Sequence, residues 1–187
     1  MTLSHSYDVA LLYAHGLHRR QQRKGTPIPY ISHLLSVSSL VLEHGGTETE
    51  AIAALLHDAA EDQGGAPRLE EIREHFGEAV ANIVRDCTDA WTEPKPEWRT
   101  RKETYIAALE HKPAASLRVS LADKTHNAEA ILRDYLREGE RTFERFNGGA
   151  EGTRWYYGAL LDCFERRLPG ELCERLGRAV EGFADAA

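Results

Sequence analysis

The chain has 187 residues, of which 42% are hydrophobic and 28% are charged, and its formal net charge is −7. This length and composition allow one domain with a sizeable core, whereas the negative charge argues against general nucleic-acid binding, which needs a basic face. No run of about 18 apolar residues occurs, so we expect no membrane-spanning helix.

The N-terminal residues and the cysteines bear on the cellular compartment. Residues 1–8 contain neither the basic stretch nor the apolar stretch of a signal peptide. The three cysteines, Cys87, Cys163 and Cys173, lie far apart and lack the spacing of a zinc site. A sparse and odd set of cysteines is typical of a reducing compartment. We therefore expect a cytoplasmic protein without disulfides.

Apolar residues recur at helical spacing along the chain, and no stretch shows the alternation of a β-strand. We expect helices at about residues 4–22, 33–44, 48–62, 69–75, 78–87, 99–110, 114–136, 153–168 and 171–183. Glycines and prolines separate them, such as Gly45-Gly46 and Pro169-Gly170. Residues 88–97 contain two prolines and are expected to form a mobile connection. The predicted fold class is all-α.

The stretch 51–62 is the most informative part of the sequence. It begins with apolar residues, and His57, Asp58, Glu61 and Asp62 follow within six residues. Residues three and four apart share a helix face, so these groups should converge at the end of a buried helix. Buried carboxylates need a cation or protons, and a divalent metal is the simplest remedy. A solvated, acidic helix end is the alternative interpretation.

Two further residues complete a set of metal ligands. His33 falls in the first turn of the second predicted helix, and Asp123 lies among apolar residues of a later, long helix. Together with His57 and Asp58 they offer two imidazoles and two carboxylates. Such a mixed nitrogen and oxygen set suits Mn²⁺, Fe²⁺, Mg²⁺ or Zn²⁺. A cation of this kind lowers the pKa of bound water and polarises a phosphoryl oxygen.

Other charged residues fit around this cluster. Glu61 and Asp62, one turn further on, are placed to position or deprotonate a water molecule. Arg23, Lys24 and Lys124 are suited to neutralising the phosphates of a substrate. For the pair Arg23 and Lys24 a second interpretation is open, because cations near the C-terminus of a helix also interact favourably with its dipole.

A His in one helix, an adjacent His-Asp pair in the next and a distant Asp together resemble the HD-domain superfamily of metal-dependent phosphohydrolases. Longer motifs are similar to the hydrolase domain of RelA/SpoT-type alarmone enzymes: Arg-Lys-Gly-Thr-Pro-Ile-Pro-Tyr-Ile-Ser-His (23–33), Ala-Leu-Leu-His-Asp-Ala-Ala-Glu-Asp (54–62), His-Phe-Gly (75–77) and Leu-Ala-Asp-Lys-Thr-His-Asn (121–127). The resemblance runs from about residue 8 to about residue 160. It implies a single HD-domain helical bundle over residues 1–187, with a C-terminal helical extension at 169–187.

The resemblance also implies an activity and a role for each matched position. The family removes the 3′-pyrophosphate of (p)ppGpp in a Mn²⁺-dependent reaction that gives GDP or GTP and pyrophosphate. The implied metal ligands are His33, His57, Asp58 and Asp123. The implied catalytic pair is Glu61 and Asp62, and the implied nucleotide contacts are Arg23, Lys24, Asn127 and one of two adjacent tyrosines, which we take as Tyr156 rather than Tyr157.

Some positions differ from the residues usual in that family, namely Ala59-Ala60, Gln63, Thr125-His126 and the loop from Trp91 to Trp98. The identity of the substrate therefore stays open. One alternative is an HD-domain phosphatase of another phosphorylated nucleotide, for example a nucleotide or NADPH phosphatase. Another is a non-catalytic, nucleotide-binding regulator, although the intact acidic pair argues against it. In each case the partner is a small phosphorylated nucleotide rather than a nucleic acid or a membrane.

Overall fold

The computed structural model describes residues 2–91, 94 and 96–184. Within them the chain forms helices and one isolated bridge between Gln22 and Pro29, without a strand. The helices are α1 His5–His18, α2 Ile31–Glu43, α3 Glu48–Leu56, α4 Ala59–Asp62, α5 Gly65–Phe76, α6 Glu78–Cys87, α7 Trp98–Leu109, α8 Ala114–Glu138, the 3₁₀ helix η1 Gly139–Arg145, α9 Gly149–Arg167 and α10 Glu171–Phe183. The predicted all-α fold class is confirmed.

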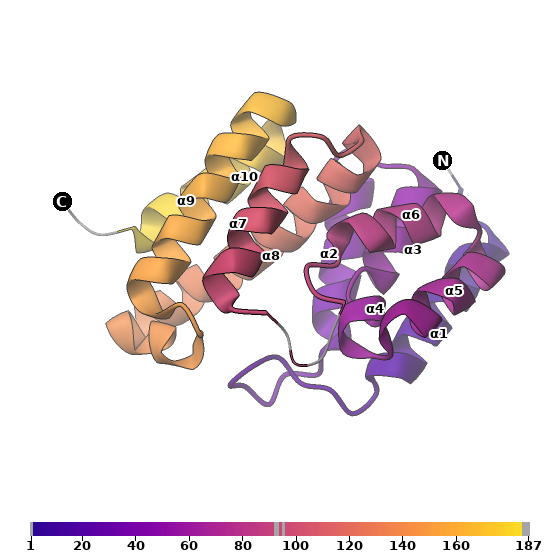
Figure 1. Cartoon of the computed structure of the whole chain (residues 1–187), viewed down its shortest axis with the longest axis horizontal. Helices are drawn as coiled ribbons and strands as arrows, with labels where there is room; N and C mark the ends of the chain where they lie inside the picture. The colour runs from indigo at the N-terminus through magenta and orange to yellow at the C-terminus, as the bar shows by residue number, and fades with distance from the viewer. Residues whose placement is uncertain (1, 92–93, 95, 185–187) are drawn as a thin grey trace.

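The long helix α8 lies between two groups of helices (Figure 1). It packs against α2, α3 and α6 from the N-terminal group and against α9, α10 and η1 from the C-terminal group. Because it has neighbours on several sides, α8 buries residues around much of its circumference, including Leu117, Val119, Leu121 and Ala128. Side chains from both groups can therefore meet along one side of α8.

The helix predicted at 48–62 begins as expected, since Thr47 and Glu50 form a capping box, but it is not continuous. Helix α3 ends at Leu56, and His57 and Asp58 form a turn before α4. Adjacent residues of a regular α-helix point about 100° apart. At this turn His57 has φ −59° and ψ −30°, and Asp58 has φ −94° and ψ −5°, so the backbone departs from regular helical angles chiefly at Asp58.

The first predicted helix is also shorter than expected, because α1 ends at His18 rather than near residue 22. The following backbone turns back on itself: Arg23 N–H donates to the carbonyl of Ile28, and Tyr30 N–H donates to the carbonyl of Gln21. The backbone N–H and carbonyl groups of this segment therefore form hydrogen bonds within the loop and do not extend α1. Arg23 and Lys24 therefore lie in this loop, past the last turn of α1.

Helix α7 is fixed to α9 by one aromatic side chain. The indole of Trp98 lies against Gly148 and Gly152, and a Cβ atom at Gly148 would come within 2.5 Å of the ring. Only glycine leaves room for the ring at this position. The connection before Trp98 was predicted to be mobile, and residues 92, 93 and 95 of it lie outside the described part of the chain.

The C-terminal helix α10 packs against α8 and α9. Its buried face includes Leu172, Leu176 and Phe183, and the ring of Phe183 contacts the rings of Phe143 and Tyr157. The segment predicted as a C-terminal extension thus contributes to the hydrophobic core.

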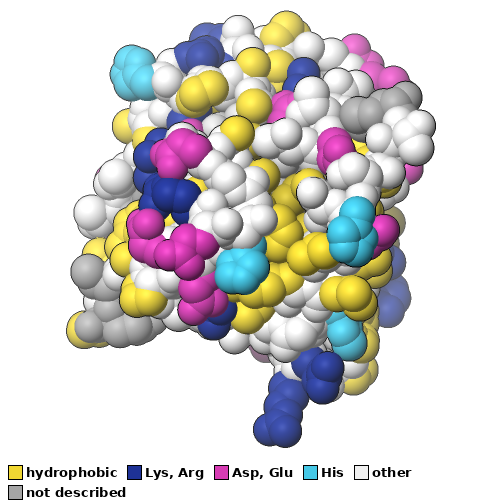
Figure 2. All heavy atoms as spheres, turned by 90° about the vertical axis from the view of Figure 1, so that its right-hand side faces the viewer, with side chains coloured by type: hydrophobic (Ala, Val, Ile, Leu, Met, Phe, Trp, Pro, Cys, Tyr) yellow, Lys and Arg dark blue, Asp and Glu magenta, His cyan; other side chains and the backbone are white. Residues whose placement is uncertain are grey.

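Figure 2 shows the face on the right of Figure 1, where apolar, acidic, basic and histidine side chains are mixed among the residues drawn in colour. On this face the basic side chains do not form an extended surface of their own, in line with the net charge of −7. None of the helices in the described ranges has the length and apolar character needed to cross a bilayer.

Candidate active site

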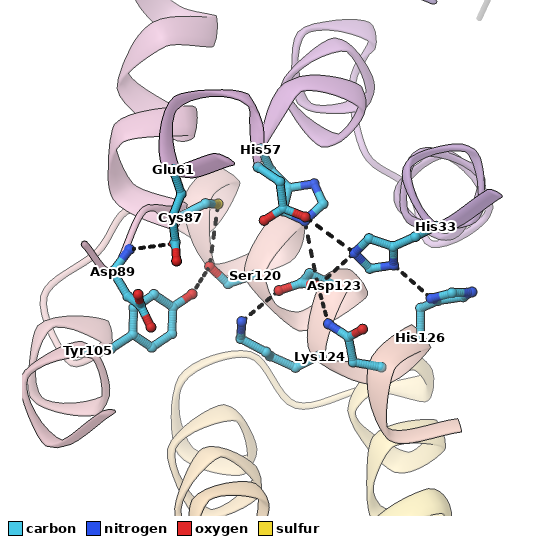
Figure 3. A network of polar contacts seen from close by, with 12 residues as sticks. His33, His57, Glu61, Cys87, Asp89, Tyr105, Ser120, Asp123, Lys124 and His126 are labelled. Carbon is cyan, nitrogen blue, oxygen red and sulfur yellow. Dashed lines mark hydrogen bonds and ion pairs between the residues drawn. The ribbon is translucent and has the colours of Figure 1, made fainter. Parts of the chain in front are cut away.

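The four predicted metal ligands converge at one point beside α8. Figure 3 labels three of them, His33, His57 and Asp123. His33 comes from α2, His57 and Asp58 from the turn after α3, and Asp123 from α8. The Nε2 atom of His57 lies 3.0 Å from Asp58 Oδ2 and 3.5 Å from Asp123 Oδ1. The Nε2 atom of His33 lies 3.6 Å and 3.2 Å from the same two oxygens. Both imidazoles are buried, so the cluster is closed to bulk water on their side.

The donor atoms fit a divalent metal. His57 Nδ1 lies 2.8 Å from the carbonyl oxygen of Ala54, which can only accept, so Nδ1 carries a proton and Nε2 is the ring nitrogen that faces the cluster. Within the described residues, the Nε2 atoms of His33 and His57 are buried without a hydrogen-bond partner, although both face carboxylate oxygens. A cation bound among these atoms would satisfy both nitrogens and neutralise the two carboxylates.

The carboxylates of the cluster stay ionised despite their burial. Burial acts to raise the pKa of Asp58, but the charge and hydrogen bonds of His57 and His33 lower this pKa well below its usual value. For Asp123 the same effect of burial is overcome chiefly by Lys124, whose Nζ lies 2.6 Å from Oδ2. Two ionised carboxylates facing one point attract a cation.

Tyr30 supports this arrangement from the side. Its hydroxyl donates to Asp58 Oδ2 at 2.6 Å. Burial and the neighbouring Asp58 raise the pKa of Tyr30 far above its usual value, so the phenol remains a hydrogen-bond donor. Sequence analysis did not single out this residue. Its signal was its position in the 23–33 motif, three residues before His33.

The predicted catalytic pair lies on α4, next to the cluster. The carboxylate of Glu61 is half-buried and accepts a hydrogen bond from the backbone N–H of Asp89 at 3.3 Å. The carboxylate of Asp62 is more exposed and accepts from Gln21 Nε2 at 2.8 Å. Gln21 in turn accepts from Gln63 Nε2 at 2.7 Å. Both carboxylates are thus held by groups from other segments while they line the same small pocket as Asp58.

The Asp89 side chain is buried and contacts several charged residues, a role that the sequence did not indicate. Its carboxylate oxygens lie 2.6 Å from Arg101 Nη1 and 2.5 Å from Lys102 Nζ, both on α7. Its backbone N–H is the group that donates to Glu61. Asp89 therefore connects the cations of α7 to the catalytic pair. The sequence did show a basic start to the helix at 99–110, but nothing linked that start to Asp89.

Two depressions meet at the site. The smaller has a volume of about 170 Å³ and carries the carboxylates Asp58, Glu61, Asp62, Asp89 and Asp123. The larger has a volume of about 540 Å³ and carries the cations Arg23, Lys24, Lys102, Lys124, Arg133 and Arg145, and Asp134 is the only carboxylate among its described lining residues. They adjoin, since Tyr30, Lys102, Lys124 and Asn127 line both. An acidic metal end and a basic cleft suit a substrate that carries several phosphates.

The residues predicted to contact the substrate all line the larger cleft. Asn127 donates from Nδ2 to Asp123 Oδ1 at 2.6 Å and accepts a hydrogen bond from Arg23. Lys24 donates from Nζ to Asn147 Oδ1 at 3.3 Å. Tyr156 and its neighbour Tyr157 both line the cleft, and the buried hydroxyl of Tyr156 has no hydrogen-bond partner among the described residues.

One departure from the usual family residues lies directly behind the cluster. His126 Nδ1 is 2.8 Å from Nδ1 of His33. Burial, followed by the neighbouring His33 and Arg23, lowers the pKa of His126 to about 3, so this ring is neutral at physiological pH. A neutral His126 can accept the proton on His33 Nδ1, which leaves His33 Nε2 directed at the cluster.

An all-helical fold with a buried His and Asp cluster beside a basic cleft defines the class of metal-dependent phosphohydrolases with an HD domain. A family model described as HD domain matches residues 10–153, and the chain belongs to this family. The predicted HD-type fold and the dependence on a divalent metal are thereby confirmed at the level of the family.

Relatives and solved structures narrow the comparison. The chain is 41% identical over 136 residues to guanosine-3′,5′-bis(diphosphate) 3′-pyrophosphohydrolase MESH1 of Xenopus tropicalis, covering 68% of this chain and 73% of the relative. It is 37% identical over 168 residues to the Mus musculus protein of the same name, covering 80% and 88%. A solved structure described as a metazoan ortholog of SpoT that hydrolyzes ppGpp matches with a TM-score of 0.78 and 26% identity over 97% of both chains.

Proposed function

We propose that this protein is a guanosine-3′,5′-bis(diphosphate) 3′-pyrophosphohydrolase, which converts (p)ppGpp to GDP or GTP and pyrophosphate. The observation that carries the proposal is the junction of the two depressions: an acidic pocket lined by the ligands Asp58 and Asp123 adjoins a cleft with six cations among its described lining residues. The relatives that bear this activity in their names support it. One domain over residues 1–187 is part of the proposal, supported by the packing of α10 on α8.

We assign the metal site to His33, His57, Asp58 and Asp123, and Mn²⁺ is the proposed ion. When bound, a divalent cation polarises a phosphoryl oxygen and lowers the pKa of water. The mixed imidazole and carboxylate ligands support this assignment. They suit Mn²⁺, whereas a structural Zn²⁺ ion is usually held by sulfur ligands.

The remaining steps fall to the residues of the chain. Glu61 and Asp62 orient a water molecule and take its proton as its oxygen attacks the phosphorus joined to the 3′-oxygen. The bond between that phosphorus and the 3′-oxygen breaks, pyrophosphate leaves, and the 3′-oxygen takes up a proton. Lys102 and Lys124 line both depressions and offset the negative charge of the reacting group. Arg23, Lys24, Asn127 and Tyr156 bind the nucleotide.

The test is release of pyrophosphate from ppGpp by the purified protein with Mn²⁺, compared with release of phosphate from NADPH and other phosphorylated nucleotides. The proposal expects pyrophosphate from ppGpp, and expects Glu61→Gln and Asp62→Asn to keep the metal while turnover falls by about 10²-fold or more. A higher kcat/KM for NADPH or another nucleotide would replace this function with the phosphatase alternative. Metal binding without turnover of any nucleotide would favour the non-catalytic regulator.

The compartment belongs to the same proposal. All three cysteines, Cys87, Cys163 and Cys173, are free. Free thiols are typical of a reducing environment, which supports a cytoplasmic location.

A further inference from the structure

His18 is a buried residue that is neither a metal ligand nor one of the described lining residues of the two depressions. It is the last residue of α1. Its ring stacks on the ring of Tyr30, with the centroids 5.2 Å apart and the planes inclined by 18°. The hydroxyl of Tyr30 in turn donates to the metal ligand Asp58 at 2.6 Å. His18 therefore packs against a residue that supports one side of the metal cluster.

Two hydrogen bonds join His18 to the catalytic carboxylate of Asp62, and their direction is fixed. An ionised carboxylate only accepts, so the Gln21 amide presents Nε2 to Asp62 Oδ2, at 2.8 Å, and turns Oε1 away from it. This Oε1 atom lies 2.7 Å from His18 Nδ1. Because an amide oxygen also only accepts, Nδ1 carries a proton and donates. Both hydrogen bonds thus point from His18 toward Asp62.

The protonation of His18 agrees with this direction. Burial lowers the pKa of His18 below its usual value, so the ring is neutral at physiological pH and carries one proton. With that proton on Nδ1, Nε2 holds a lone pair, and within the described ranges this buried nitrogen has no hydrogen-bond partner. Gln63 Nε2 donates to the same Gln21 oxygen at 2.7 Å. Two donors from different segments therefore hold the Gln21 amide in one orientation.

The position of Asp62 explains why its carboxylate needs such support. Asp62 is exposed and is the last residue of α4, a helix of four residues. An exposed carboxylate can adopt several rotamers, and only those within about 3 Å of the attacking water allow it to act as a base. A hydrogen bond from a held amide selects one orientation before the substrate binds.

We propose that His18 and Gln21 are positioning residues for the reaction: His18 holds the Gln21 amide, and Gln21 holds the Asp62 carboxylate toward the attacking water. The inference rests on the proposed function and adds to it two residues that act through Asp62. No proton needs to pass along these hydrogen bonds, since their role is to fix a direction. Their loss should therefore slow the chemical step and leave substrate binding and the metal in place.

The test is steady-state hydrolysis of ppGpp with Mn²⁺ by the whole protein and its variants. Gln21→Met keeps the length of the side chain but removes the hydrogen bonds of the amide. A misplaced base slows only the chemical step, so we expect kcat to fall by about tenfold or more while KM and bound metal stay at wild-type values. Gln22→Leu is the matched control, because Gln22 is the exposed neighbour of Gln21 and is not among the described residues that line either depression. Its kcat should equal that of the wild type.

His18 is tested by a pair of variants. His18→Phe keeps a ring against Tyr30 but removes the donor, so it should lower kcat as Gln21→Met does. His18→Asn loses the ring but places an amide donor near the position of Nδ1, so its kcat should lie closer to the wild type even though its Tm is lower. A purely structural role of His18 predicts the opposite order of kcat, because Phe fills the buried space better than Asn.

A double-mutant cycle shows whether the effect passes through Asp62. In an Asp62→Ala background, Gln21→Met should leave the residual kcat unchanged. The same fall of kcat in both backgrounds would overturn the proposal. Wild-type kcat or loss of the bound metal in Gln21→Met would also overturn it, as would a higher kcat in His18→Phe than in His18→Asn. If Gln21→Met does not fold, the two His18 variants decide.

Failure of the proposed function would look different, because the wild type itself would release no pyrophosphate from ppGpp. If the wild type hydrolyses another phosphorylated nucleotide instead, the same variants are compared with that nucleotide, since Asp62 orients the water in either reaction. A wild type that turns over no nucleotide would overturn the function and this inference together.

Discussion

The backbone N–H of Asp89 donates to the carboxylate of Glu61 at 3.3 Å, although the two residues belong to different segments. The side chain of Asp89 is at the same time bound to two cations of α7, Arg101 and Lys102. One residue thereby sets the position of a catalytic carboxylate and of a lysine that lines both depressions. Asp89 can affect the reaction through these neighbours.

Replacing Asp89 should reduce turnover without removing the metal. In Asp89→Asn the ion pairs to Arg101 and Lys102 are lost, so Lys102 shifts from its position, whereas the backbone N–H that donates to Glu61 is kept. Because displacements of about 1 Å can lower rates by about 10²-fold, we expect kcat to fall by about tenfold to 10²-fold with full metal content. Asp86→Asn is the control, since Asp86 bonds to Ser116 and lines neither depression. Wild-type kcat in Asp89→Asn would contradict the positioning role.

Asp89 should also contribute to stability in a pH-dependent way. Burial acts to raise its pKa, but Lys102, followed by Lys124 and Arg101, lowers the pKa to about 2. Since the folded pKa lies below the unfolded value of about 3.9, the contribution of about 2 kcal/mol is complete above that value and is lost as the pH falls toward 2. Urea unfolding should therefore separate wild type and Asp89→Asn at pH 7, and the difference should shrink to about a third of that value at pH 2.5. A gap that does not change with pH would show that the charge of Asp89 is not responsible.

We expect the bound metal to stabilise the folded chain in addition to supporting the reaction. A cation that binds only the folded chain, at about 100 times its Kd, adds about 3 kcal/mol, so adding Mn²⁺ after chelation should raise Tm by about 5–10 °C. Asp58→Asn removes one ligand and should abolish both the rise in Tm and the bound metal. The exposed Asp8→Asn should behave like the wild type. Full metal occupancy in Asp58→Asn would refute the assignment of this ligand.

The loop with Arg23 and Lys24 has two interpretations, binding of the substrate and interaction with the dipole of α1, and one variant can distinguish them. Lys24 lies in the cleft and past the end of α1, so Lys24→Ala should raise KM by about tenfold and leave Tm unchanged. Arg20→Ala is the control, because Arg20 lies closer to the end of α1 and does not line the larger cleft. A lower Tm with an unchanged KM in Lys24→Ala would instead support an interaction with the helix dipole.

The metal ligands could be predicted from sequence because each carries a local signal. His57 and Asp58 follow an apolar stretch, and Asp123 interrupts another, so burial of a polar group was evident at each position. The break between α3 and α4 was not evident, because the residues around it favour a continuous helix. At this break the Nε2 atom of His57 and the Oδ2 atom of Asp58 lie 3.0 Å apart, a contact that no periodic pattern in the sequence shows.

Residues that act through long-range packing were missed. Asp89 and Lys102 meet where α7, which carries Trp98, packs against α9. Arg145 reaches the cleft only because η1 returns alongside the loop that contains Gly25. Neither relationship leaves a periodic pattern or a short motif in the sequence. For these residues the three-dimensional arrangement was required.

The division of the metal ligands between two parts of the chain has a consequence for biosynthesis. Three ligands belong to α2 and to the turn after α3, whereas Asp123 arrives with α8. A nascent chain has therefore exposed His33, His57 and Asp58 to solvent well before the fourth ligand leaves the ribosome, and tight retention of the ion must await the docking of α8. Once α8 has docked, the ion links segments that are remote in sequence, much as a covalent cross-link would. The metal content of a freshly made pool of this protein would then measure the fraction of chains that have completed their fold.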